Sequence, residues 1–111
     1  MYAIMRKACL VLGLLPAGLL PVAAQAQTGA DLAAGKSCMA CHQVDTKRVG
    51  PPFRSVAERY AGQDNAQDYL INKVLHGSRG DWGAVPMPAQ SQVSAAEAKD
   101  LVQWILSLSK P

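Results

Sequence analysis

One five-residue run constrains this 111-residue chain more than any other feature: Cys38-Met39-Ala40-Cys41-His42. Two cysteines three positions apart, followed directly by a histidine, form the attachment signature of a c-type haem. On one helical turn both thiols can form thioethers with the two vinyl groups of a single haem, which sets the histidine beneath the ring. We therefore expect one covalent haem c per chain, attached through Cys38 and Cys41, with His42 as an axial iron ligand.

Three other uses of these cysteines fit the sequence less well. A thioredoxin-type pair belongs to a βαβ unit, and the chain has no strand-like alternation of any length. A zinc site would need Cys38, Cys41, His42 and His76, but the adjacent Cys41 and His42 converge poorly on a tetrahedral ion. A disulfide between the two cysteines would close too small a loop to stabilise the fold much.

The first 26 residues have the pattern of an export signal. Arg6 and Lys7 precede an apolar run, which ends in the small-residue sequence Ala24-Gln25-Ala26. The run is close to the length of a membrane span, but its two prolines and its small-residue end favour removal over a retained anchor. We expect residues 1–26 to be a cleaved secretory signal peptide and residues 27–111 to be a periplasmic domain.

The charge of the chain argues against a polyanionic partner. Lys and Arg number 11 against 8 Asp and Glu, and removal of Arg6 and Lys7 leaves residues 27–111 almost balanced. We therefore expect no nucleic-acid partner, since such binding needs a clear excess of positive charge. A domain this small also has difficulty burying enough apolar surface by itself, so a cofactor should occupy its centre.

Helical spacing dominates residues 27–111. We expect an all-α fold with about four helices and no sheet. Ser94 and Glu97 form a capping box at the start of the last helix, and Gly50-Pro51-Pro52 cannot continue a helix. The expected helices span residues 28–41, 53–60, 66–75 and 94–108, and the expected long loops span 43–52 and 78–93.

Three residues are candidates for the second axial ligand. Met87 lies in Val85-Pro86-Met87-Pro88, where two prolines stiffen the loop that presents the thioether. Met39 lies between the attachment cysteines and cannot reach the opposite face of the haem. We expect Met87 to be the ligand. His76 is the rival donor, but it comes directly before Gly77 at a helix end, where an imidazole more often caps carbonyl groups.

The motifs together resemble those of the small bacterial class I monohaem cytochromes c. The resemblance rests on Cys38 to His42, Val49-Gly50-Pro51, Trp82-Gly83 and Pro86-Met87-Pro88, and it covers essentially all of residues 27–111. It implies about four helices wrapped around one covalently bound haem. It also implies a one-electron carrier, not an enzyme, similar to the short periplasmic donors of nitrite reductases and oxidases.

The resemblance implies roles for further residues around the haem. The Pro51 carbonyl would accept the Nδ1–H of His42 and orient the ring, and the Trp82 indole would donate to a haem propionate. Lys73 stands where relatives often carry a propionate-binding Arg, although Lys lacks the bidentate fork. Gln90 stands where relatives often carry an Asn, which leaves its hydrogen bond to the Met87 sulfur open.

The resemblance also implies redox proteins as partners. A cytochrome bc1-type complex would be the donor, and a nitrite reductase, terminal oxidase or peroxidase the acceptor, with the carrier a monomer that is not inserted in the membrane after cleavage. Ala84, Val85 and Pro86 would form an apolar docking patch. Lys36, Lys47, Arg48 and Arg54 are either a basic rim that steers partners or ordinary solvated charges. Two alternatives remain: a haem c subunit of a larger respiratory complex, and a ligand-binding or peroxidatic haem protein if Met87 is labile.

Overall fold

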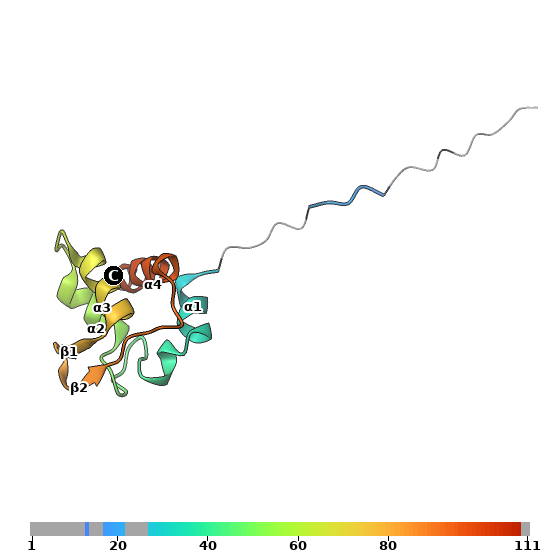
Figure 1. Ribbon diagram of the computed structural model, residues 1–111. Helices are drawn as coiled ribbons and strands as arrows, with labels where there is room; N and C mark the ends of the chain where they lie inside the picture. The colour runs from blue at the N-terminus through green and yellow to red at the C-terminus, as the bar shows by residue number, and fades with distance from the viewer. Residues whose placement is uncertain (1–12, 14–16, 22–26, 110–111) are drawn as a thin grey trace, which may run out of the picture.

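The computed structural model describes residues 13, 17–21 and 27–109. Most of the predicted signal peptide, residues 1–26, lies outside these residues. In the part of the chain that is described, no helix is both long and apolar enough to cross a membrane. The elements in chain order are α1 (Gly29–Gly35), the 3₁₀ turn η1 (Cys38–Ala40), α2 (Phe53–Tyr60), α3 (Ala66–His76), β1 (Ser78–Gly80), β2 (Gly83–Met87) and α4 (Ala95–Ser107) (Figure 1).

Helix α4 is the central element of the fold, because α1, α2 and α3 all pack against it. It begins with the expected capping box, in which the Glu97 amide donates to Ser94 Oγ over 3.1 Å. Its buried side chains are Ala98, Leu101, Val102 and Ile105, which recur at helical spacing and face the core. The crossing with α1 is tight, since a Cβ atom added at Gly29 would lie 2.1 Å from Trp104 Cβ.

The first helix is shorter than the sequence predicts. Helix α1 begins at a capping box between Thr28 and Asp31 but ends at Gly35, well before Cys41. Ser37 follows with a left-handed backbone (φ 65°), which breaks the helix between Gly35 and the haem-binding motif. Cys38 therefore begins the separate 3₁₀ turn η1, and Cys41 follows this turn directly. The turn directs them independently of the axis of α1.

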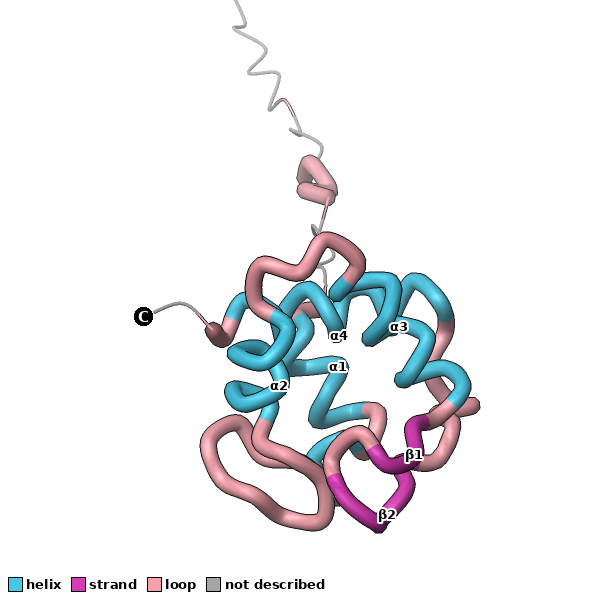
Figure 2. Tube along the Cα trace, turned by 90° about the vertical axis from the view of Figure 1, so that its left-hand side faces the viewer, coloured by secondary structure: helices cyan, strands magenta, loops and turns pink. Residues whose placement is uncertain are grey.

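The expected absence of a sheet is wrong. Strands β1 and β2 pair in antiparallel fashion within the segment 78–93 (Figure 2). Ser78 lies opposite Met87, and Gly80 lies opposite Gly83. The strands are too short to show an alternating pattern, and β2 is almost entirely exposed. Backbone pairing, not burial of one face, therefore holds them together, and such pairing leaves no signal in hydrophobic periodicity.

The other elements agree with the sequence. Helix α2 has the predicted bounds, α3 runs one residue further than predicted, and the segment 43–52 is a loop. Hydrogen bonds join the two ends of this loop. The amides of Phe53 and Arg54 donate to the carbonyls of Gln43 and Val44 over 2.9 and 3.0 Å. The closure sets the loop between the haem-binding motif and α2.

Candidate haem site

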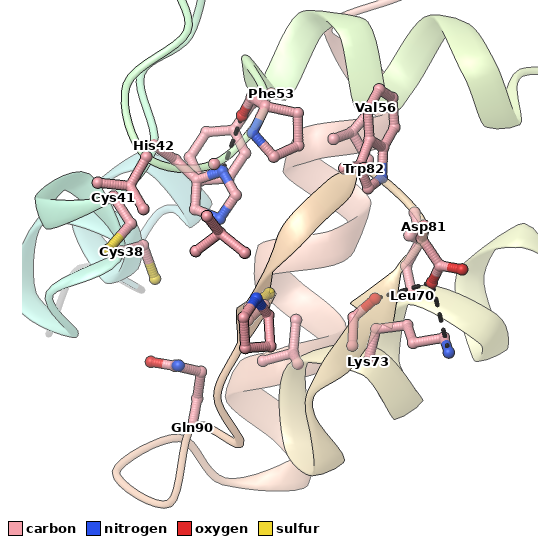
Figure 3. Close-up of a pocket in the computed structure, with 18 of the residues that line it drawn as sticks. Cys38, Cys41, His42, Phe53, Val56, Leu70, Lys73, Asp81, Trp82 and Gln90 are labelled. Atoms are coloured by element: carbon pink, nitrogen blue, oxygen red, sulfur yellow. Dashed lines mark hydrogen bonds and ion pairs between the residues drawn. The ribbon is translucent and has the colours of Figure 1, made fainter.

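The predicted site residues all line one cavity (Figure 3). Part of its wall is the apolar core itself, contributed by α2, α3 and α4. The core side chains that face the cavity are Phe53, Val56, Tyr60, Leu70, Leu101, Val102 and Ile105. The predicted site residues that share it are Cys38, Cys41, His42, Pro51, Lys73, Trp82 and Met87. Segments far apart in the sequence thus converge on one space that is largely apolar.

The two cysteines are free thiols at the edge of this cavity. Cys38 is half-buried and Cys41 is exposed. Amides of Cys41 and His42 both donate to the Cys38 carbonyl, over 3.2 and 3.0 Å, and tighten the turn that carries them. Burial raises the pKa of the Cys38 thiol above its ordinary value.

The His42 imidazole is buried and held from three sides. Its Nδ1–H donates to the Pro51 carbonyl oxygen over 2.8 Å, since a carbonyl can only accept. The Phe53 ring stacks on it with centroids 4.7 Å apart and planes inclined by 17°. On a third side, a Cβ atom at Gly50 would lie only 2.6 Å from His42 Cε1. This arrangement fixes the ring and leaves the Nε2 lone pair free to bind a metal ion.

The rival axial donors lie in different surroundings. Met87 ends β2 and lines the same cavity as His42. His76 is exposed at the end of α3 and lines a different pocket, on which Met87 also borders. Met39 packs against the hydrophobic core and does not line the cavity. Of these three candidates, Met87 is therefore the one that lines the cavity that His42 faces.

Trp82 and Lys73 have partners within the protein that the sequence did not indicate. The guanidinium of Arg59 lies 4.5 Å from the centre of the Trp82 ring, and its Nη1–H donates to the Asp81 carbonyl over 2.6 Å. Lys73 Nζ lies 3.5 Å from Asp81 Oδ2 and 4.9 Å from the centre of the Tyr69 ring. Arg59 thus fixes the turn that carries Trp82, and Asp81 forms an ion pair with Lys73.

The Asp81 carboxylate accepts hydrogen bonds from two hydroxyl groups at the rim of the cavity. The Ser78 hydroxyl donates to this carboxylate over 2.7 Å and the Tyr69 hydroxyl over 3.2 Å. These bonds, that of Ser78 foremost, hold the pKa of Asp81 below its ordinary value, with Lys73 adding to the effect. Asp81 therefore keeps a negative charge beside Trp82. Its position next to that tryptophan was the one available signal, but an isolated acidic residue has no diagnostic spacing.

The structure gives partners within the protein for Gln90 and for two basic residues whose roles the sequence leaves open. The Gln90 side-chain amide donates to the Pro88 carbonyl over 2.7 Å, and the described residues include no hydrogen bond from it to the Met87 sulfur. Lys36 pairs with Glu97 over 2.8 Å, and Arg54 pairs with Asp45 over 2.5 Å. Two members of the suggested basic rim are therefore engaged within the protein.

The donor set and its surroundings fit a covalent haem. Two free thiols, an imidazole with an available Nε2 and a thioether border one cavity with an apolar wall. Gly50 lies so close to the His42 ring that the imidazole cannot shift toward it, which suits an iron ligand of fixed position. Among the described residues, no group of three or more His, Cys, Asp or Glu side chains is arranged to hold a bare metal ion.

Known proteins are similar to this chain over most of its length. The family model for cytochrome c matches residues 26–109. Cytochrome c-552 of Nitrosomonas europaea is 50% identical over 97 residues, which cover 87% of this chain and 94% of the relative. Cytochrome c-551 of Pseudomonas aeruginosa is 44% identical over 98 residues, with 87% and 93% coverage.

The structural comparison agrees with the sequence comparison. The crystal structure of wild-type Nitrosomonas europaea cytochrome c552 matches with a TM-score of 0.71 and 51% identity, over 72% of this chain and 99% of that one. Cytochromes c of this kind carry electrons between redox proteins, are not enzymes and bind haem c covalently. The chain belongs to the cytochrome c family, as a small class I monohaem member close to cytochromes c-551 and c-552.

Proposed function

We propose that the chain is a periplasmic one-electron carrier, exported and cleaved after Ala26, whose haem iron is bound by His42 and Met87. Cys38 and Cys41 would form the two thioethers. The observation that carries this proposal is the convergence of these four side chains on one cavity with an apolar wall. When bound, the haem supplies the reversible one-electron couple of its iron.

The residues of the chain prepare this site before any electron moves. Pro51 holds the His42 proton on Nδ1, which directs Nε2 at the iron and makes it a more basic ligand. Met87 offers a soft thioether that favours ferrous iron, which raises the reduction potential. With His42 and Met87 both holding the iron, no position would be left for oxygen or peroxide, so electron transfer would be favoured over catalysis.

Trp82 and Lys73 are proposed to face the haem propionates, and they differ in how freely they can do so. Trp82 lies at the cavity beside Arg59, with 37% of its surface exposed. Lys73 already forms an ion pair with Asp81. We expect Trp82 to be the stronger propionate donor, since Lys73 would have to satisfy two carboxylates at once.

Partner docking is proposed at the exposed apolar residues beside the cavity. Val85 is 66% exposed and Val49 is 52% exposed, and Ala84 and Pro86 are exposed beside Val85. All four line the cavity, so a redox partner seated on them would approach the haem directly. A cytochrome bc1-type donor and a nitrite reductase, terminal oxidase or peroxidase as acceptor would fit a monomeric carrier of this kind.

Absorption spectra of the exported holoprotein test the ligand assignment. The oxidised protein should show the weak band at the red edge that is characteristic of Met–Fe(III). His76→Ala, the matched control at the rival donor, should keep this band. Met87→Ala should lose it, and its dithionite-reduced form should bind carbon monoxide. A parent protein that lacks the band and binds carbon monoxide readily would contradict the proposal and favour a ligand-binding or peroxidatic protein.

A further inference from the structure

Gly77 lies where the end of α3 meets the segment that carries Met87. Its backbone angles are φ 86° and ψ 170°, a combination that is essentially restricted to glycine. A Cβ atom at this position would lie 2.8 Å from the Met87 carbonyl oxygen and 3.1 Å from the Ala89 amide nitrogen. The Met87–Ala89 backbone therefore packs directly against the Cα atom of Gly77.

Backbone hydrogen bonds fasten the same segment to α3. The Gln90 amide donates to the Val74 carbonyl over 3.0 Å, so the chain is tied to the helix just beyond Met87. The Gly77 amide donates to the Lys73 carbonyl over 2.9 Å and completes the end of α3. On the other side of the contact, Met87 pairs with Ser78 in the sheet. Met87 is thus held by its pairing with Ser78 and by the hydrogen bond that fixes the chain just after it, at Gln90.

We propose that Gly77 is a positioning residue for Met87. Its bare Cα atom lets the Met87 backbone seat against the end of α3, and this seat fixes where the thioether enters the cavity. Helix α3 is a firm base for it, because Leu70 is buried in the core. The inference rests on the proposed ligation of iron by Met87. It adds that the strength of this ligand is set by a residue that has no side chain.

Gly77→Ala in the holoprotein tests the seat against a matched control, Gly62→Ala. Gly62 also has a positive φ, 75°, but a Cβ atom there would meet nothing within 4 Å. Both variants strain the backbone, and only Gly77→Ala pushes on the Met87 carbonyl. We expect Gly77→Ala to lose most of the red-edge band, to have a lower reduction potential and to bind carbon monoxide when reduced. Gly62→Ala should match the parent protein in all three.

These spectroscopic readouts separate the seat from general destabilisation. If the band, the potential and the carbon monoxide binding of Gly77→Ala equal those of Gly62→Ala, the seat is overturned. Met87→Ala separates the seat from the proposed ligation. A parent protein that already lacks the band shows that the ligation itself fails. A band that is lost in Met87→Ala but intact in Gly77→Ala shows that only the seat fails.

A second pair of variants reaches the seat without changing the glycine, in case Gly77→Ala does not fold. Gln90→Pro removes the amide that donates to the Val74 carbonyl, and Gln90→Ala removes the same side chain but keeps that amide. A weaker band and lower potential in Gln90→Pro than in Gln90→Ala supports the seat. Equal values in the two variants overturn it.

Discussion

Glu97 links two parts of the molecule through one carboxylate. It accepts a hydrogen bond from the Ser94 amide over 3.1 Å, as the capping box of α4 requires, and it pairs with Lys36 over 2.8 Å. Lys36 in turn donates to the Gln92 carbonyl, and the Gln92 side chain donates back to the Lys36 carbonyl. One side chain therefore caps a helix and ties the segment after α1 to the loop before α4.

Glu97 should make the stability of the holoprotein depend on pH. Lys36, together with the amide and hydroxyl of Ser94, lowers the pKa of Glu97 from 4.5 to about 2. Because the folded pKa is the lower one, the stabilisation is complete above the unfolded value and is lost as pH falls toward about 2. In thermal unfolding from pH 7 to pH 2, we expect the melting temperature of Glu97→Gln to lie below that of the parent at neutral pH. The difference should shrink between about pH 5 and pH 2.

A matched control for this titration is Asp64→Asn. Asp64 is exposed between α2 and α3, and among the described residues it makes no hydrogen bond or ion pair through its side chain. The melting temperature of Asp64→Asn should follow that of the parent from pH 7 to pH 2. If the melting temperatures of Glu97→Gln and the parent differ by the same amount down to pH 2, a role for the carboxylate charge is contradicted.

At the scale of elements, short α1 depends on its contact with α4. Seven residues are too few for a stable helix in isolation, so packing must hold it. Its buried side chains are Leu32, which is 2% exposed, and Ala33, which is fully buried. Since η1 follows α1 directly, this contact also anchors the turn that carries Cys38.

Leu32→Ala should therefore destabilise the holoprotein by about 2–5 kcal/mol, the range for truncation of a buried leucine. Denaturant unfolding followed by circular dichroism gives the free energy of unfolding directly. Leu32→Met is the conservative control, and it should cost less than about 1.5 kcal/mol because it keeps the volume. Equal free energies for the parent and Leu32→Ala would show that α1 contributes little to the fold.

The elements also show how far the sequence can be interpreted. The bounds of α2 and α4 follow from spacing and capping signals, because their apolar faces meet one continuous core. The break at Ser37 depends on one left-handed residue, and the β1–β2 pair depends on backbone bonds between exposed strands. Neither leaves a hydrophobic pattern. Among the site residues, His42 and Met87 stand in recognisable motifs, whereas Arg59 becomes a neighbour of Trp82, and Lys73 a neighbour of Asp81, only through the fold.

At the scale of the whole molecule, the hydrophobic core and the candidate haem site are one structure. The cavity is walled by side chains that belong to the same cluster as the buried faces of the helices. His42 joins the two through Phe53, which stacks on its ring and meets Trp104 edge-on with centroids 5.5 Å apart. A group that fills the cavity would therefore complete the core as well as perform the chemistry.

The chain without haem should consequently be largely unfolded. Without haem, the apolar wall of the cavity loses the group that packs against it, and even the void left by truncating one large buried side chain costs about 2–5 kcal/mol. A void the size of a cofactor is larger, so its cost is comparable to the whole stability of a small domain, about 5–15 kcal/mol. The double variant Cys38→Ala, Cys41→Ala cannot attach haem, and its circular dichroism should show little helix and no cooperative thermal transition. The parent holoprotein, measured alongside, should melt cooperatively.

Addition of free haem to this double variant distinguishes loss of the core from loss of the cysteines. If the cofactor completes the core, haem should restore much of the helical signal and a cooperative transition, since His42 and the apolar wall are still present. Helical signal and a cooperative transition before haem is added would show that the protein part of the core is sufficient by itself. The fold would then precede the cofactor, and the cavity would be a preformed site within an independently stable domain.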